Sequence, residues 1–410
     1  MGNNYDVIIV GGGFAGLSVA SELSGSGLKV LVLEQNKVLG VNNNPVRGTF
    51  ESVVDKYKLR SSVINCYDRI NFYGSKSRAG VKLSNDKICL FDSARMLNVL
   101  KKRVGCKVVT GFEVVHARRR NGFIELVGLD KSYSAKVVVD ASGRSSVVAQ
   151  SFGVSNNKVY CKCYIAFLSN CCLNPGEAYY FSSPSISNGS AWIEPVSSTK
   201  CQIGVSTFEP YTMLTKEGLR RGALFLMKKF GPAKKMLSRA RIVKGSERCI
   251  RYPIEPSETL VMDNLLIVGD AAGLATPLLG EGVRVILDMS KACAETIKDA
   301  FARKDFSAKF LKGYEKKWWL QYGKYYGWGL VLRHYIAKNF GDNEWNETIK
   351  RLDSLTQKEK EMFIKSQMNY TIFRKLTSIN TTKKMLSNKL INTLPQLNML
   401  KQRHFVSHFV

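Results

Sequence analysis

The glycine motif between residues 11 and 16 constrains the fold more than any other feature of the chain. Gly11, Gly13 and Gly16 keep the spacing Gly-x-Gly-x-x-Gly, directly after a β-rich run at 5–10 and at the start of a helical run at 14–27. In such a turn the first glycine permits the sharp bend, the second lets the backbone approach a pyrophosphate, and the third lets the helix pack on the sheet. The helix N-terminus then offers free N–H groups to phosphates. The motif predicts a βαβ unit that binds a dinucleotide.

An acidic residue after the next strand supports this interpretation. The run 28–33 reads as a second strand, and Glu34 follows it, 18 residues beyond Gly16. A carboxylate at this place can accept hydrogen bonds from ribose hydroxyls and disfavours a 2′-phosphate. Because the strand, the helix and the acid all agree, dinucleotide binding is favoured over an ordinary glycine-rich turn.

A second glycine-rich region follows a late strand. Residues 264–268 have the pattern of a buried parallel strand, and Gly269-Asp270-Ala271-Ala272-Gly273 comes directly after it. Small residues allow a cofactor to approach closely, and Asp270 can accept a hydrogen bond from a polyol hydroxyl, cap a helix, or do both. The segment 278–282, Leu-Leu-Gly-Glu-Gly, predicts another glycine-rich helix start, suited to the carbonyl edge of a planar ring.

The remaining pattern changes along the chain. Residues 86–103 look helical after the potential cap Asp92-Ser93, and residues 106–139 alternate as strands around a hairpin turn at Asn121-Gly122. A helix is expected at 215–238, and the chain after residue 282 is mostly helical. Further strand-like runs, which predict an antiparallel sheet, lie at 159–168, 177–182, 190–195 and 201–208.

The charge of the chain points to an acidic partner. Lysine and arginine number 61 and aspartate and glutamate 33, which gives a formal net charge of +28. Nucleic acid, an anionic membrane surface and an acidic protein all fit such a balance. No nucleic-acid-binding module is present, and Arg118–Arg120 lie at the expected hairpin tip, so no nucleic-acid partner is expected. A third hypothesis makes the protein a basic binding protein, not an enzyme. Its binding surface would contain these arginines or Lys316-Lys317-Trp318-Trp319.

The ends of the chain bear on its location. The N-terminus has no basic segment of a signal peptide, and no apolar run approaches the ~20 residues that span a bilayer. We therefore expect a cytoplasmic protein that can lie peripherally on a membrane. Residues 371–410 contain seven lysines or arginines and no acid, and basic and apolar positions alternate there. Such a surface either lies on anionic headgroups or packs as a solvated helix on the body.

Ten cysteines are present, but their spacing lacks the paired hooks of a zinc site. Cys161 and Cys163 alternate in a strand-like run, which puts both on one face. Buried structural cysteines are the favoured interpretation, and a disulfide is the next. No metal site is expected.

Three motifs in this order resemble the FAD-dependent superfamily of p-hydroxybenzoate hydroxylase. They are the N-terminal glycine motif, Asp140-Ala141-Ser142-Gly143, and Gly269-Asp270. The resemblance implies FAD as cofactor and an α/β (α+β) fold with a Rossmann-like FAD-binding domain, an antiparallel β-sheet substrate domain and a C-terminal helical region. The expected boundaries are 1–60, 86–153 and 260–300 for the FAD-binding domain, 61–85 and 154–259 for the substrate domain, and 301–410 for the helical region.

A narrower resemblance is to the geranylgeranyl reductases, which saturate polyprenyl double bonds. The segment 269–282 is similar to their late motif, Pro45-Val46-Arg47 to their early Pro-Val-Arg segment, and Ala191-Trp192-Ile193-Glu194-Pro195 to their Trp-x-Phe-Pro segment. The chain departs from that family at Gly48, where a cysteine is usual, and at Ser190 and Glu194, where aromatic residues are usual.

The resemblance also implies site residues. Glu34 would meet the adenosine ribose, Arg95 the pyrophosphate region, and Asp270 the ribityl or phosphate region of the flavin. For Arg95 an exposed helix arginine is the less favoured alternative. Trp192 can equally be core. The residues expected to bind the cofactor are Gly11, Gly13, Phe14, Ala15, Gly16, Glu34, Arg47, Arg95, Asp270, Pro277, Gly280 and Gly282. Those expected to line the substrate cavity are Arg47, Trp192, Glu194 and Glu281.

The reaction that the resemblance implies is reduction of C=C bonds of a geranylgeranyl lipid or diphosphate by hydride from reduced FAD. No catalytic residue is assigned, although Glu194 and Glu281 are candidate proton donors. The electron donor stays open among ferredoxin, NAD(P)H and a deazaflavin. The alternative is a flavin monooxygenase or halogenase acting on an aromatic or quinone substrate. The aromatic cluster from Trp318 to Trp328 either lines a lipid tunnel or packs between helices.

Overall fold

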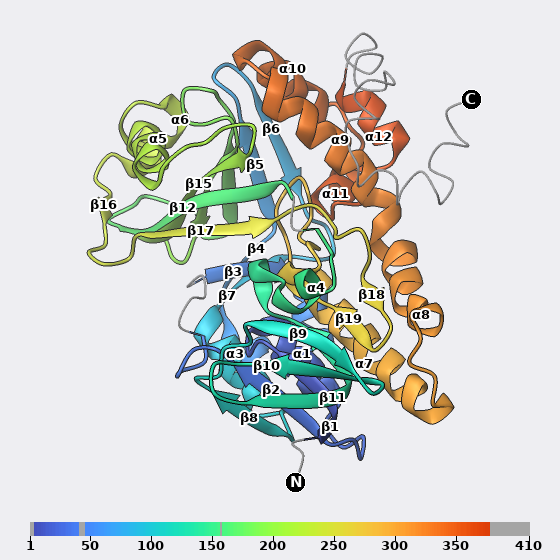
Figure 1. Cartoon of the computed structure of the whole chain (residues 1–410). Coiled ribbons are helices and arrows are strands. Elements are labelled where there is room, and N and C mark those ends of the chain that lie inside the picture. Colours follow the sequence, from blue (N-terminus) through green and yellow to red (C-terminus); the bar gives the residue numbers. More distant parts are fainter. Residues whose placement is uncertain (1–3, 41–45, 156–157, 378–410) are drawn as a thin grey trace.

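A mainly parallel sheet forms the base of the molecule (Figure 1). The computed structural model describes residues 4–40, 46–155 and 158–377. Strand β1 lies at the centre of this sheet, parallel to both β2 and β11, because its residues Val7–Val10 are apolar and buried on both faces. The path through the sheet is β18 (Val261–Met262), β19 (Leu265–Ile267), β11 (Ser132–Asp140), β1 (Asn4–Val10), β2 (Val30–Glu34) and β8 (Lys107–Thr110).

A hairpin adds two antiparallel strands to β11. β9 (His116–Arg120) and β10 (Phe123–Val127) are joined by Asn121 and Gly122, which take positive φ values of 49° and 75°. This is the backbone that a two-residue hairpin turn requires. The hairpin expected at this dipeptide is confirmed.

Helices α1 (Phe14–Glu22) and α7 (Val283–Arg303) pack together on the parallel sheet. The helix α1 is shorter than the expected 14–27, since Gly25 and Gly27 take positive φ values of 74° and 78° and end it. Helix α3 (Ser93–Lys101) is capped as expected by Asp92, whose carboxylate accepts a 2.9 Å hydrogen bond from the backbone N–H of Arg95. The residues before this cap form a strand, not the expected helix.

The second sheet is the large β-sheet above the base in Figure 1. Its path is β16 (Arg241–Ile242), β12 (Tyr160–Ser169), β15 (Lys200–Glu209), β14 (Ala191–Pro195), β13 (Glu177–Phe181), β5 (Arg69–Tyr73) and β6 (Arg78–Lys82), with β17 (Arg248–Pro253) also paired to β12. The pairs are antiparallel except β13 with β5. Helices α5 (Lys216–Lys228) and α6 (Gly231–Leu237) contribute to the apolar core on one of its faces. The single helix expected at 215–238 is therefore two, separated at Lys229 and Phe230.

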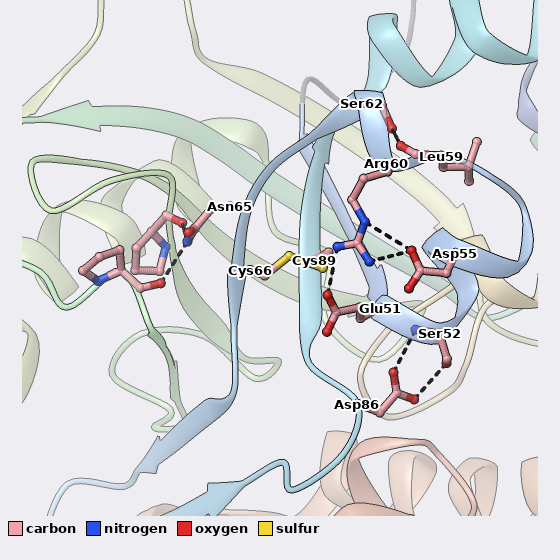
Figure 2. Close-up of a disulfide and its surroundings, with 12 residues drawn as sticks. Glu51, Ser52, Asp55, Leu59, Arg60, Ser62, Asn65, Cys66, Asp86 and Cys89 are labelled. Atoms are coloured by element: carbon pink, nitrogen blue, oxygen red, sulfur yellow. Dashed lines mark hydrogen bonds and ion pairs between the residues drawn. A yellow bond between two sulfur atoms is a disulfide. The ribbon is translucent and has the colours of Figure 1, made fainter.

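A small three-stranded sheet lies between the two large ones. It has the order β3 (Val46–Phe50), β7 (Ile88–Asp92) and β4 (Val63–Tyr67), and helix α2 (Glu51–Lys56) follows β3. Figure 2 shows the disulfide between Cys66 and Cys89 of adjacent strands, and Asn65 beside it. The amide of Asn65 donates to the carbonyl of Pro195 at 2.7 Å, which ties this sheet to the end of β14.

The cysteines follow both interpretations offered by the sequence. Cys161, Cys163, Cys171, Cys201 and Cys293 are free and buried, as favoured. Cys66 and Cys89 instead form the disulfide that was the second interpretation, because the pairing of β4 with β7 places them opposite each other.

The C-terminal helices run along one side of the molecule, from the parallel sheet to the second sheet (Figure 1). They are α8 (Ala308–Trp318), a π-helical turn at Trp319–Gly323, α9 (Lys324–Asn339), α10 (Asp342–Asp353), α11 (Gln357–Ile364) and α12 (Tyr370–Leu376). Trp318 packs against Tyr326 with ring centroids 5.6 Å apart, so this part of the aromatic cluster is helix packing. Among the described helices, none combines the length and apolar character needed to cross a bilayer.

The architecture confirms the expected α/β (α+β) fold. The sheets do not by themselves draw domain boundaries, because β4 belongs to the small sheet while β5, from the same expected segment, joins the second sheet. The expected boundaries remain a proposal. Residues 378–410 of the basic C-terminal segment lie outside the described residues.

The packing of α1 gives a first prediction. A Cβ added at Gly16 would lie 1.8 Å from the carbonyl oxygen of Gly11, whereas one added at Gly313 in α8 meets nothing within 4 Å. Gly16→Ala should therefore lower the thermal midpoint of unfolding strongly. Gly313→Ala, the same change in open space, should raise stability by about 0.5–1 kcal/mol through helix propensity. Thermal unfolding followed by circular dichroism checks both; equal midpoints for the two variants would contradict this packing.

Candidate active site

The first part of the site is the turn between β1 and α1. Gly11 takes a positive φ of 110°, and a Cβ there would lie 2.3 Å from the carbonyl oxygen of Ala141, so only glycine fits. Gly13 is the N-cap of α1 and supplies no side-chain cap. A Cβ at Gly13 would meet nothing within 4 Å, so the backbone here faces open space. The turn therefore presents backbone N–H groups at a helix N-terminus to an anion.

Glu34 lies beside this turn at the end of β2. Its Oε2 accepts a 2.7 Å hydrogen bond from the N–H of Gly12, and its Oε1 accepts from the backbone N–H and the amide of Asn36 at 2.9 and 2.6 Å. These donors hold a buried carboxylate in a fixed position next to the glycine turn. Oε1 already accepts two hydrogen bonds, whereas Oε2 accepts one and keeps a second lone pair, so Oε2 fits a ribose hydroxyl as a further donor.

Asp140, from the middle sequence motif, is a structural residue. It is fully buried and accepts hydrogen bonds from Ser142 N–H at 3.1 Å, Ser142 Oγ at 2.6 Å and Ala149 N–H at 2.8 Å. These bonds join the end of β11 to helix α4 (Val147–Ser151). Burial raises the pKa of Asp140, and the hydrogen bonds from Ser142 and Ala149 oppose that rise.

The second part of the site is a cavity of about 330 Å³ with a mainly apolar wall. One face of the second sheet, the small sheet, the segment 275–283 and helices α9 to α12 enclose it. Arg47, Trp192, Glu194, Asp270, Pro277, Gly280, Glu281 and Gly282, all expected site residues, line its wall. Its size and lining are those of a site for an organic ligand.

Arg47 and Asp270 supply opposite charges at this wall. The Arg47 guanidinium lies 4.9 Å from the ring centroid of Phe14. Burial lowers the pKa of Arg47 and raises the pKa of Asp270. The negative charge of Asp270 raises the pKa of Arg47, and the positive charge of Arg47 lowers the pKa of Asp270, so each partly offsets the effect of burial. The Nε of Arg47 is buried without a hydrogen-bond partner among the described residues. A buried donor without a partner is costly, so this atom fits an acceptor on a bound ligand.

The segment 277–282 is fixed from both sides. Arg333 of α9 donates to the carbonyl of Pro277 at 2.8 Å and also to that of Leu278. Gly280 takes a positive φ of 68°, and a Cβ there would meet the hydroxyl of Tyr252 at 2.3 Å. The carboxylate of Glu281 accepts a 2.8 Å hydrogen bond from the N–H of Arg284, which fixes the start of α7. This rigid, glycine-containing segment fits the edge of a planar ring.

Trp192 and Glu194 extend from β14 into the cavity wall. A Cβ at Gly204 on the neighbouring strand would fall 2.1 Å from the Trp192 indole, so the indole lies across this glycine. Trp192 is therefore both packed on the sheet and part of the wall. Glu194 pairs with Gln202 of β15, whose amide donates to Oε2 at 3.1 Å.

Some expected residues lie apart from the cavity. Arg95 is exposed on α3, with no hydrogen bond or ion pair from its guanidinium to the described residues, so its role near a pyrophosphate remains a proposal. Gly11, Gly13 and Glu34 form the glycine turn rather than the cavity wall. Pro45 lies outside the described residues.

The sequence interpretation missed three polar residues. Arg333 is distant in sequence from the segment it holds, so no local pattern marked it. Lys158 donates to the carbonyl of Ala271 at 2.8 Å, and burial lowers its pKa to about 8. Tyr252 was missed because it lies in a strand of ordinary β character.

Comparisons with known proteins show which proteins this chain is similar to. Residues 6–155 match the family described as FAD dependent oxidoreductase. The digeranylgeranylglycerophospholipid reductase of Methanocaldococcus jannaschii is 26% identical over 88% of this chain and 94% of its own length, and that of Methanosarcina acetivorans is 26% identical over 93% and 94%.

Solved structures show the same fold. A geranylgeranyl bacteriochlorophyll reductase-like protein from Thermoplasma acidophilum matches 98% of this chain and 100% of its own with a TM-score of 0.75 and 17% identity. A myxobacterial chondrochloren halogenase matches 93% and 96% with a TM-score of 0.68 and 17% identity. Since the glycine turn, the family match and the relatives coincide, the chain is an FAD-dependent oxidoreductase that resembles the geranylgeranyl reductases.

Proposed function

We propose that this protein reduces C=C bonds of a polyprenyl lipid of the geranylgeranyl type, or of its diphosphate, with FAD as the redox cofactor. The observation that carries the proposal is the mainly apolar cavity that begins at the segment 277–282 and continues between the second sheet and the C-terminal helices. An isoprenoid chain is apolar and long, so such a cavity suits it. The related reductases that act on digeranylgeranylglycerophospholipids support the same substrate class.

The roles proposed for the FAD-binding residues follow the geometry. Gly11 and Gly13 would place the helix N-terminus against the pyrophosphate, and Glu34 would accept hydrogen bonds from the adenosine ribose. Asp270 and Arg47 would lie toward the ribityl and flavin end. Phe14, Ala15, Gly16, Pro277, Gly280 and Gly282 would supply close packing around the cofactor, and Arg95 would remain near the pyrophosphate.

The protein residues would contribute binding, orientation and exclusion of water. When bound and reduced, FAD supplies a hydride. An isolated alkene has no carbonyl to polarise, so the rate depends on holding the double bond in place and keeping the cavity dry. Arg333 serves this by fixing the backbone of Pro277 and Leu278.

The partners and location remain part of the proposal. The electron donor is ferredoxin, NAD(P)H or a deazaflavin, and the excess positive charge suits an acidic carrier or an anionic membrane. A cytoplasmic protein that lies on that membrane surface would reach a lipid substrate.

A flavin monooxygenase or halogenase is the second candidate. The polar side chains Ser190, Glu194 and Gln202 on the cavity wall favour it, because they could bind the hydroxyl of an aromatic substrate. It predicts oxidation of NAD(P)H in air that an aromatic ligand stimulates, whereas the reductase predicts anaerobic oxidation of reduced flavin by an isoprenoid lipid.

The glycine turn gives a prediction about cofactor binding. In Gly13→Val the new side chain extends into the space proposed for the pyrophosphate, and an N-cap change of this kind costs the fold only about 1 kcal/mol. The variant should fold but lose most of its FAD, measured as the ratio of flavin to protein after purification. The control Gly313→Val introduces the same side chain at another open glycine and should keep its FAD. Full FAD occupancy in Gly13→Val would contradict the proposed position.

The cavity gives a prediction about the substrate. Leu279 is partly buried and lines the cavity, whereas Leu320 is 58% exposed on the molecular surface. Leu279→Trp should keep FAD but slow the anaerobic oxidation of dithionite-reduced enzyme by geranylgeranyl lipid at least tenfold. The reason is that the new indole fills cavity space that the isoprenoid chain needs. Leu320→Trp should behave as wild type. Stopped-flow flavin absorbance measures the rate; unchanged oxidation in Leu279→Trp would place the substrate elsewhere.

A further inference from the structure

Glu194 is an unusual residue on the cavity wall. It directly precedes Pro195 on β14, and its side chain lines a mainly apolar cavity whose wall includes the segment 277–282. The pairing of β14 with β15 places it opposite Gln202, whose amide donates to its Oε2 at 3.1 Å. Asn65 holds the carbonyl of Pro195 at 2.7 Å, so the end of this strand is fixed.

The charges around Glu194 leave it without a cationic partner. The groups that bear on its charge are the amide of Gln202 and the indole of Trp192, and no lysine or arginine among the described residues pairs with it. Its titratable neighbours are Tyr67 and Tyr180, from β4 and β13, and Cys201 of β15. Burial raises the pKa of both tyrosines, and the thiol of Cys171 together with burial raises the pKa of Cys201, so all three are neutral near pH 7.

Two further carboxyl groups of the wall, Asp270 and Glu281, differ in this respect. The cations Arg47 and Lys158 act on Asp270. Arg284 is the cation beside Glu281. Glu281 lies 3.4 Å from the guanidinium of Arg284 and accepts the backbone N–H of the same residue. Glu281 is therefore bound through Arg284 and fixes the start of α7. Burial raises the pKa of Glu194 to about 7, so a large share of it carries a proton at neutral pH.

We propose that Glu194 is the proton donor of the reduction, a role that rests on the proposed function. As hydride adds to one alkene carbon, the O–H bond of the Glu194 carboxyl breaks and its proton forms the new C–H bond at the other carbon. The two electrons come from the reduced flavin, and the carboxylate left behind takes a proton from water before the next turnover. A general acid whose pKa lies near the working pH is suited to this step.

The kinetic test uses the holoenzyme reduced anaerobically with dithionite and mixed with digeranylgeranyl glycerophospholipid in micelles. Oxidation of the reduced flavin by wild type should slow as pH rises through about 7, because the protonated carboxyl disappears. Glu194→Gln should lower this rate about 10²–10⁴-fold and remove that pH dependence. The control Glu177→Gln changes a glutamate of β13 that does not line the cavity and should leave both unchanged.

A second measurement does not depend on turnover. The infrared carbonyl band of a protonated carboxyl group should titrate with a midpoint near pH 7 in wild type and be missing from Glu194→Gln. The pKa of Glu194 is higher in the folded than in the unfolded protein. Its contribution to the free energy of unfolding is therefore fully present below the pKa of the unfolded state and is lost as pH rises through about 7. Glu194→Gln should lack that loss.

The outcomes separate the two proposals. Wild-type activity with an unaltered rate and pH profile in Glu194→Gln would overturn the proton-donor role alone, as would the absence of a carbonyl band that titrates near pH 7. No oxidation of reduced wild type by any isoprenoid lipid would overturn the proposed function, and the role of Glu194 with it.

Discussion

The contact between helix α9 and the segment 277–282 is the interaction on which the rest of the site depends. The guanidinium of Arg333 donates to two successive backbone carbonyls, and burial in this place lowers its pKa to about 10. Hydrogen bonds from a charged donor are roughly twice as strong as neutral ones, so these two bonds hold the segment firmly. The segment that it holds follows the end of β19 in the parallel sheet and forms one wall of the cavity, so helix α9 sets the geometry of that wall.

Much of the fold followed from short patterns in the sequence. The glycine turn, Glu34 and the strand pattern of 5–10 and 28–33 are local, and the structure places them as one βαβ unit. The early end of α1 was missed, because positive φ at Gly25 and Gly27 depends on the tertiary path of the chain. The break between α5 and α6, directly before Gly231 and Pro232, was also missed.

The wall of the cavity was predictable only in part. Trp192, Glu194, Asp270 and the segment 277–282 were found from their motifs, because similar motifs mark the reductase family. Arg333 and the Cys66–Cys89 disulfide join residues that are far apart in sequence or belong to no motif. Only the pairing of strands and the docking of α9 bring these groups together. Local patterns in one sequence do not predict such contacts between residues that are distant along the chain.

The polar residues of the second sheet give the cavity a mixed character that pure hydrocarbon binding does not require. Glu194 and Gln202 are costly to place in an apolar wall, since each loses water that it would otherwise bind. The proposed delivery of a proton by Glu194 would account for their place in this wall.

The central claim is that this cavity holds an isoprenoid chain whose double bonds are reduced. Mass spectrometry of geranylgeranyl lipid after one anaerobic turnover with reduced enzyme tests it most directly. The account predicts a product that has gained two hydrogen atoms for each flavin oxidised. Lipid of unchanged mass, with the flavin still reduced, would contradict it.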